Sequence, residues 1–343
     1  MKRCKKCFLP KNYPNIKLNE KGICNYCLES RVIIREGFDT KATNAKRMKL
    51  KKDFEKFIKS IKGKSEYDCL LLFSGGKDST YLLYLLKEKY GLNVLTLSVD
   101  TGLERETTKN NIKRIVKHFD VDHILFVPEN DFYKRFYKYY LKNPGNATYC
   151  DTICGLCSSI MHSIGLNIAA EMKIPFVALG YSPEQAYCYE FSKEKLSKSW
   201  VPKELYNESF SEKDRGYFWN PKNVNKKNIP RFILPFYVLD YPGVENIIEE
   251  LSELGLRIKK KLDPLKSNCY LVFLLMHLDL IKYGYTTYSA HISSLIRAGN
   301  LREREKYIII LTLGAWLLKH GLVKQRNIKR ALDHLELKME DII

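Results

Sequence analysis

Short apolar runs alternate with segments of helical periodicity between residues 66 and 190 of this 343-residue chain. The runs are rich in Leu, Val, Ile and Phe, as buried strands are, and the segments between them repeat apolar residues every three or four positions. This alternation predicts an α/β fold with a doubly wound parallel sheet, whose ligands bind beyond the carboxyl ends of the strands. The predicted strands are residues 67–73, 94–99, 123–127 and 176–179.

The pattern changes on both sides of this region. The first residues are rich in turn formers, and a charged stretch with helical spacing follows them. Beyond the predicted strands lies a polar and aromatic segment, and then a mostly helical region that includes a short ordered run at 231–236. The predicted parts are a ribbon at 1–35, a linker helix at 36–65, a nucleotide-binding domain at 66–190, an insertion or lid at 191–230 and a helical C-terminal region at 231–343.

The chain carries 58 Lys and Arg against 39 Asp and Glu, a net charge of +19. An excess of this size predicts an anionic partner such as a nucleotide, a nucleic acid or a phosphorylated sugar, although a generally Lys-rich composition explains it equally well. The first 17 residues lack the apolar core of a secretory signal, so we expect a cytoplasmic protein. The apolar stretches 270–281 and 307–318 fall short of the ~20 residues of a membrane span and predict buried helices.

Four cysteines near the N-terminus have the spacing of a metal site. They form two CxxC pairs separated by sixteen residues, with Pro, Asn and Gly between them. Two such turns close a tetrahedral thiolate site of the kind that Zn²⁺ prefers, and a full set of four protein ligands favours a structural role. Four unrelated free cysteines and a redox cluster are the alternatives. The residues are Cys4, Cys7, Cys24 and Cys27.

A Gly-Gly turn joins the first predicted strand to the helix after it. Such a turn aims backbone N–H groups and the positive end of the helix dipole at one point, which makes an anion cradle. The glycines let phosphate approach the backbone, the serines donate hydrogen bonds, the lysine neutralises phosphate charge, and the aspartate orients the loop or a Mg²⁺ ion. The spacing differs from the P-loop and from GxGxxG. The residues are Ser74, Gly75, Gly76, Lys77, Asp78 and Ser79.

This SGGxDS signature resembles that of the PP-loop ATP pyrophosphatase superfamily, and its six residues match without departure. The resemblance implies an adenine nucleotide alpha-hydrolase-like fold in which the loop holds the pyrophosphate end of ATP, with Mg²⁺. It also implies an enzyme that adenylates a carbonyl, amide or carboxylate oxygen, releases pyrophosphate and lets a nucleophile displace AMP. Lys77 and Asp78 would then be catalytic.

Two further residues follow predicted strands and would lie at the same edge of the sheet as Ser74. Asp100 follows the strand at 94–99, and Gly180 follows the strand at 176–179. Because ligands bind beyond the carboxyl ends of parallel strands, both are candidates for nucleotide contact, and Asp100 also for metal contact. A structural role for Asp100, as a helix cap or a turn residue, fits the sequence equally well.

A second cysteine group lies in Tyr149-Cys-Asp-Thr-Ile-Cys-Gly-Leu-Cys157, before a predicted helix. Thiolates at a helix start are stabilised by the helix dipole, which favours nucleophilic sulfur chemistry or soft-metal ligation; ordinary core packing is the alternative. Sulfur-inserting members of the superfamily carry a similar CxxC, completed by a distant third cysteine into a [4Fe-4S] cluster with one open iron. That resemblance implies Cys154, Cys157 and Cys269 as ligands, with Cys150 as the competitor for the third position.

The combined segments resemble a narrower family, the N-acetyl sugar amidotransferases. The similarity rests on Cys-Lys-Lys-Cys-Phe-Leu-Pro, Gly-Ile-Cys-Asn-Tyr-Cys, the SGGKDS loop and Ser-Leu-Ile-Arg-Ala-Gly-Asn-Leu-Arg-Glu-Arg. It implies a role in surface polysaccharide biosynthesis, with a phosphate- or nucleotide-linked sugar as substrate and a partner glutaminase that supplies ammonia. The basic segment around Arg297, Arg302 and Arg304 would bind an anionic group or cap helices.

The cysteines at 150, 154, 157 and 269 depart from the amidotransferase pattern and match thiolating relatives. The alternative function is therefore an iron–sulfur-dependent sulfur transferase that acts on tRNA or a small molecule with a sulfur donor. The implied cofactors are ATP, Mg²⁺ and Zn²⁺, together with a [4Fe-4S] cluster under this alternative. Both functions are compatible with a homodimer.

Overall fold

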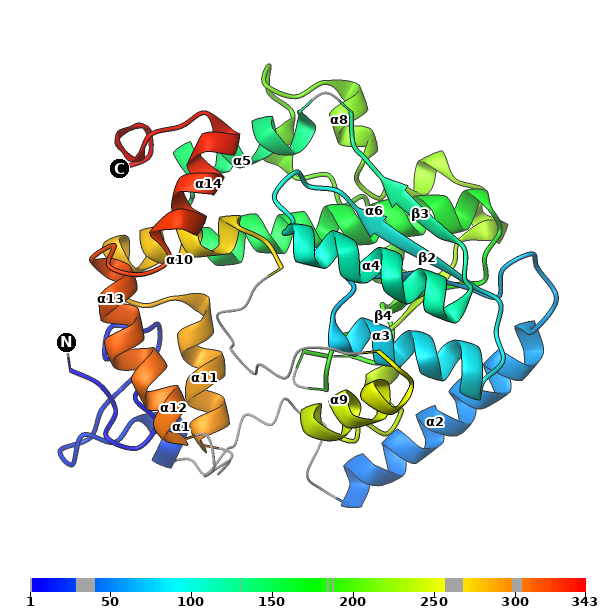
Figure 1. The fold of residues 1–343 in the computed structure, drawn as a ribbon, viewed down its shortest axis with the longest axis horizontal. Coiled ribbons are helices and arrows are strands. Elements are labelled where there is room, and N and C mark those ends of the chain that lie inside the picture. Colours follow the sequence, from blue (N-terminus) through cyan, green and yellow to red (C-terminus); the bar gives the residue numbers. More distant parts are fainter. Residues whose placement is uncertain are drawn as a thin grey trace. The chain divides into compact units, whose positions relative to one another are not determined.

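The computed structural model describes residues 2–28, 41–129, 131–183, 185–186, 188–256, 268–297 and 304–343. The chain divides into two compact units (Figure 1). Unit 1 comprises Met1–Asp39, Lys134–Leu156 and Cys269–Ile343, and unit 2 comprises Thr40–Tyr133 and Cys157–Asn268. Arg302 and the other residues from 298 to 303 of the basic segment lie outside the described residues, as does the part of the predicted linker helix at 36–40.

Unit 2 is built on a five-stranded parallel sheet in the order β3-β2-β1-β4-β5. This confirms the predicted parallel α/β fold. The predicted strand at 67–73 is shorter in the structure. β5 was not predicted as a strand, because its three residues lie in a run that we predicted only to be ordered. The strands are β1 (Cys69–Leu72), β2 (Val94–Val99), β3 (His123–Phe126), β4 (Phe176–Leu179) and β5 (Arg231–Ile233).

Helices cover both faces of this sheet (Figure 1). The alternation of side chains along β1 shows which helices pack on each face. Cys69 and Leu71 belong to a core shared with α2, α3, α4 and α9. On the other face, Leu70 and Leu72 lie against Gly165 of α6, where a methyl group would meet Leu72 Cδ2 at 2.9 Å. The sheet is therefore doubly wound, as predicted. The helices are α2 (Lys41–Ile61), α3 (Lys77–Tyr84), α4 (Glu106–Phe119), α6 (Gly155–Glu171) and α9 (Val244–Glu253).

The helix that begins at Cys150 combines a π-helical turn, η2 (Cys150–Cys154), with α6 and continues to Glu171. By length and composition alone this helix could cross a membrane, but an apolar core helix passes the same test. Much of α6 is indeed buried against unit 2. The buried residues are Ile160, His162, Ser163, Ile164, Gly165, Leu166, Ala169 and Ala170.

The polar and aromatic segment after β4 contains two short helices, α7 (Lys193–Leu196) and α8 (Glu212–Gly216). Its aromatic side chains divide into two groups. Phe210, Phe218 and Trp219 are buried, and the indole N–H of Trp219 donates to the carbonyl of Leu196 at 2.7 Å. Tyr206 is exposed. The buried group packs within unit 2 and is not available to stack on a substrate.

Unit 1 joins the N-terminal ribbon to C-terminal helices through one apolar core. Cys4, Cys7, Cys24 and Cys27 share this core with Leu9 of the ribbon and with Ile292, Ile296, Tyr307 and Leu311. Here α10 is buried along most of its length, as predicted. The helices are α1 (Asn25–Leu28), α5 (Phe132–Lys142, shared between the units), α10 (Leu271–Lys282), α11 (Thr287–Arg297), α12 (Arg304–Ile309), α13 (Ala315–Lys319) and α14 (Gln325–Leu335).

The prediction of a buried helix at 307–318 is wrong in part. The segment forms α12, the π-helical turn η8 (Ile310–Gly314) and α13, with Tyr307, Leu311 and Leu318 buried. Ile309, Leu313 and Trp316 are instead about half exposed, at 55%, 54% and 51%. Helical spacing places these three residues on one outward face of the helix. The mean hydropathy of the segment does not distinguish this exposed face from the buried one.

Candidate functional site

The Gly-Gly turn leaves the carboxyl end of β1 and ends where α3 begins at Lys77, with Gly76 as the N-cap residue. Gly75 has φ +65°, and a methyl group there would meet Ile112 Cγ1 of α4 at 2.7 Å. Only glycine fits this position without strain, because the backbone is left-handed and the space is filled. The turn is thus held close against α4, and it presents backbone N–H groups at the positive end of α3.

Hydroxyl groups close the turn on itself. Ser74 Oγ and Ser79 Oγ are 3.1 Å apart, and the N–H of Gly76 donates to Ser74 Oγ at 3.4 Å. Ser79 Oγ and Thr80 Oγ1 both donate to the carbonyl of Gly76, at 3.1 and 2.7 Å. These bonds fix the conformation of the turn before any ligand arrives.

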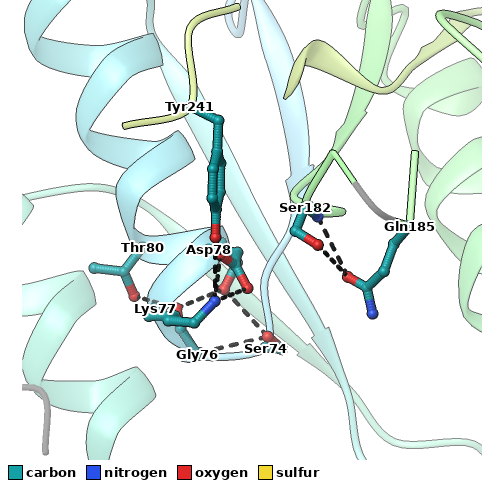
Figure 2. A network of polar contacts seen from close by, with 9 residues as sticks. Ser74, Gly76, Lys77, Asp78, Thr80, Ser182, Gln185 and Tyr241 are labelled. Carbon is teal, nitrogen blue, oxygen red and sulfur yellow. Dashed lines mark hydrogen bonds and ion pairs between the residues drawn. The ribbon is translucent and has the colours of Figure 1, made fainter. Parts of the chain in front are cut away.

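Lys77, Asp78 and Tyr241 form a triangle of polar contacts in front of this turn (Figure 2). Lys77 Nζ lies 2.6 Å from both carboxylate oxygens of Asp78. The hydroxyl of Tyr241 donates to Asp78 Oδ1 at 2.7 Å and accepts from Lys77 Nζ at 3.3 Å. Tyr241 lies 163 residues from Asp78, and our prediction from the sequence missed it. The same view shows Ser182 and Gln185 on the loop after β4.

Gly180 follows β4 and touches the backbone of the first turn of α3. A methyl group at this position would lie 2.8 Å from Ser79 Cα, 3.0 Å from Ser79 N and 3.3 Å from the carbonyl carbon of Asp78. The physical reason for glycine here is therefore the close approach of two backbones. Direct contact of Gly180 with a nucleotide stays a prediction.

We expect Gly180→Ala to displace the Ser74–Ser79 turn, because the added methyl group meets backbone atoms that cannot rotate away. Overpacking of this kind costs about 1–3 kcal/mol in free energy of unfolding. A displaced turn should also weaken ATP binding more than tenfold, a rough estimate from the sensitivity of oriented sites. Urea unfolding and ATP titration measure the two effects. Gly216→Ala is the matched control, since the methyl group that it adds would have no neighbour within 4 Å; equal behaviour of the two variants would contradict the prediction.

Asp100 follows β2 and serves a turn in the structure. Its Oδ1 accepts from the N–H of Gly102 at 2.8 Å, and its Oδ2 lies 3.1 Å from Lys109 Nζ on α4. Burial raises the pKa of Asp100, but hydrogen bonds with Glu104, Gly102 and Lys109 outweigh it, so the pKa is lowered. The pKa of the half-buried Glu104 is raised by desolvation and by Asp100. A contact of Asp100 with the nucleotide or a metal stays a prediction.

Comparison with known proteins adds to this geometry. Residues 68–145, which contain β1, the turn and β2, match the family model described as queuosine biosynthesis protein QueC. The match of residues 68–145 supports the resemblance of this part of the chain to the PP-loop ATP pyrophosphatase superfamily. The SGGKDS turn of this superfamily, Ser74–Ser79, is hereafter called the PP-loop.

The matched relatives share only part of the chain. Uncharacterized protein MJ1599 of Methanocaldococcus jannaschii is 41% identical over 75 residues, which are 22% of this chain and 27% of that protein. MJ0066 of the same organism is 32% identical over 100 residues, 29% of this chain and 20% of that protein. The match thus spans about a quarter of the length of the first relative and a fifth of the second.

Among solved structures, the U34-tRNA thiolase NcsA of Methanococcus maripaludis with its [4Fe-4S] cluster is similar, at 16% identity and a TM-score of 0.38 over 78% of each chain. NMN synthetase of Francisella tularensis is similar at 14% identity and a TM-score of 0.35, over 74% of this chain and 95% of that one. At these values the likeness assigns no activity to this chain.

The four N-terminal cysteines form a compact thiol site, as their spacing predicted. Their sulfur atoms lie within 4.8 Å of one another, and all four side chains are buried. Cys4 Sγ and Cys27 Sγ are 3.8 Å apart, and Cys7 Sγ and Cys24 Sγ are 3.6 Å apart. Zn–S bonds of about 2.3 Å in a tetrahedron place sulfur atoms about 3.8 Å apart, so the geometry fits zinc.

Groups around this thiol site shift the pKa values of its thiols in opposite directions. Burial raises the pKa of Cys4, but N–H groups of Cys7, Cys24 and Lys6 donate to its sulfur and lower the pKa to about 7. Desolvation and the charge of Cys7 raise the pKa of Cys24 to about 11, because burial and a neighbouring thiolate both disfavour negative charge on this sulfur. Arg297 on α11 donates to Cys7 Sγ at 3.3 Å. The arginine that we considered for anion binding thus faces the cysteine site.

The second cysteine group divides between the two units. Within unit 1, the thiol of Cys150 contacts that of Cys154, and burial together with the charges of Cys154, Cys150 and Cys269 raises the pKa of Tyr288. Cys157 belongs to unit 2, where it contacts the hydroxyl of Tyr133. Because the predicted ligand set Cys154, Cys157 and Cys269 includes residues of both units, it stays a prediction, as does the alternative with Cys150.

Asp279 of α10 binds the start of the helix that begins at Cys150. No pattern in the sequence indicates this role. Its fully buried carboxylate accepts from the N–H of Tyr149 at 2.7 Å and from the N–H of Cys150 at 3.4 Å. Burial raises the pKa of Asp279 to about 6 although these bonds lower it. The carboxylate takes the place of an N-cap residue contributed by another helix.

Proposed function

We propose that this chain is an ATP-dependent enzyme of the PP-loop type, which adenylates a carbonyl or amide oxygen of its substrate and then replaces that oxygen with a nucleophile. The observation that carries the proposal is the PP-loop itself, with its pre-set turn, the N-terminus of α3 and the Lys77–Asp78 pair. The hydroxyls of Ser74 and Ser79 serve the turn itself, but a purely structural Gly-Gly turn would not need the lysine.

The proposed reaction has two steps. In the first, the substrate oxygen attacks the α-phosphorus of ATP, an O–P bond forms, and the bond to the β-phosphate breaks as pyrophosphate leaves. In the second, a nucleophile attacks the activated carbon, and AMP departs with the original oxygen. The backbone N–H groups of Gly75 and Gly76, the hydroxyls of Ser74 and Ser79, and Lys77 would hold the pyrophosphate end. Bound Mg²⁺ neutralises phosphate charge, and Asp78 is the carboxylate that would hold it.

Two nucleophiles are supported by different observations. Sulfur is supported by the cysteines implied as ligands, Cys154, Cys157 and Cys269 with Cys150 as the competitor, because soft thiolate donors suit iron–sulfur ligation. This transferase would act on tRNA or a small molecule, and the net charge of +19 suits a polyanion such as tRNA.

Nitrogen is supported by the resemblance to the N-acetyl sugar amidotransferases. The two distant segments that carry this resemblance, the cysteine ribbon and the helix that ends at Arg297, share one core and the Arg297–Cys7 hydrogen bond. In this form of the proposal a partner glutaminase supplies ammonia, and the product is an acetamidino sugar.

Purification without oxygen separates the two nucleophiles. If sulfur is transferred, we expect a brown, iron-containing protein whose visible absorption is lost in Cys154→Ser and in Cys269→Ser. Cys188→Ser is the matched control, because Cys188 is a half-buried thiol outside both cysteine groups. A colourless wild-type protein would exclude the cluster, and co-purification of a glutaminase rather than tRNA would then favour nitrogen.

A further inference from the structure

We infer that Tyr241 is a positioning residue of the phosphate site, which retains Asp78 when Lys77 moves to a phosphate group of ATP. The inference rests on the proposed function and extends it to a residue outside the PP-loop motif. Tyr241 donates to Asp78 and accepts from Lys77, so its hydroxyl is tied to both members of the ion pair (Figure 2).

The location of Tyr241 is fixed from two sides. Its neighbour Asp240 pairs with Lys51 at 2.7 Å and with Arg47 at 3.5 Å, both on α2. Arg47 also donates to the carbonyl of Leu239 at 2.9 Å. The ring of Tyr241 packs edge-on against Phe236, with 5.2 Å between centroids. The hydroxyl therefore reaches the PP-loop from an anchored segment.

Exchange of partners by Lys77 explains why such a hydroxyl is useful. In the structure, the ammonium group of Lys77 is paired with Asp78 at 2.6 Å. If Lys77 turns to phosphate, the half-buried carboxylate of Asp78 loses this ion pair. A carboxylate that keeps a good hydrogen-bond donor stays stabilised and oriented when its ion pair breaks. Tyr241 supplies that donor and holds the Asp78 carboxylate in the place where it would bind Mg²⁺.

The experiment compares ATP and AMP binding to Tyr241→Phe by titration calorimetry. The substitution keeps the ring on Phe236 and removes only the hydroxyl. We expect ATP to bind about tenfold more weakly, the effect of one charge-assisted hydrogen bond. AMP lacks the β- and γ-phosphates, so its affinity should not change. Tyr81→Phe is the matched control, because Tyr81 stacks on the same Phe236 while its hydroxyl donates to Glu250 at 3.1 Å.

Each outcome decides one question. Wild-type protein that binds no ATP would remove the proposed function and this inference with it. Wild-type binding with an unchanged Tyr241→Phe affinity would overturn the inference alone. Tighter ATP binding by the variant would overturn it as well, since Tyr241 would then compete with phosphate. Equal losses for ATP and AMP would show general damage to the site instead of a role at the outer phosphates.

Discussion

Asp78→Ala is expected to nearly abolish the release of pyrophosphate from ATP, with a loss of about a hundredfold to a thousandfold, as is usual when an electrostatic group of a reacting centre is removed. The substitution takes away the partner of Lys77 and Tyr241 and the carboxylate proposed to hold Mg²⁺. The fold should persist, because Asp78 is a partly exposed residue in the first turn of α3 and the apolar residues of that helix are untouched.

Conversion of labelled ATP into AMP and pyrophosphate measures this effect, and thermal unfolding checks the fold. Glu88→Ala is the matched control, since Glu88 is an exposed carboxylate in the π-helical turn that directly continues α3. Ser74→Ala should also abolish release without loss of stability, because Ser74 is exposed and its hydroxyl serves the turn. Unchanged release in either variant would refute the assignment of the PP-loop.

The PP-loop could be predicted because its chemistry is local. Six adjacent residues contain the turn, the hydroxyls and the charge, and the apolar run before them forms the strand. The positive φ of Gly75 follows from the same short stretch. The parallel sheet was predictable for a related reason, since each strand and helix has its own period. β5 could not be predicted as a strand, because its three residues before Leu234 and Pro235 are too few to show a period.

Residues that reach the site from far along the chain could not be predicted. Tyr241 stands in a Tyr-Pro-Gly segment with no motif, and its place follows from the contact of its ring with Phe236 and from the bonds of Leu239 and Asp240 with α2. Asp279 looks like an interruption of an apolar helix, yet its carboxylate caps a helix that begins at Cys150. Gly180 was placed correctly at a strand end, but its close approach to Ser79 depends on the packing of β4 beside α3. Tertiary packing determines all three roles.

The largest expected effect on the fold comes from the four N-terminal cysteines. We expect Cys24→Ser to remove one bound zinc ion and to unfold the ribbon, since structural zinc contributes about 10–16 kcal/mol of binding free energy to such small modules. Without the ion, buried thiols at 3.6 and 3.8 Å would have to stay protonated or repel one another. The ribbon is too small to compensate by burial.

The loss should spread beyond the ribbon, because the cysteines share a core with Ile292, Ile296, Tyr307 and Leu311 of α11, α12 and η8. Metal analysis measures the zinc content, and limited proteolysis locates the unfolded segments. We expect cleavage in the ribbon and in α11 and α12, while the sheet of unit 2 keeps its protection. Cys188→Ser should retain the metal and the wild-type cleavage pattern. A Cys24→Ser protein with full zinc content and unchanged proteolysis would show that this thiol site is not what holds unit 1 together.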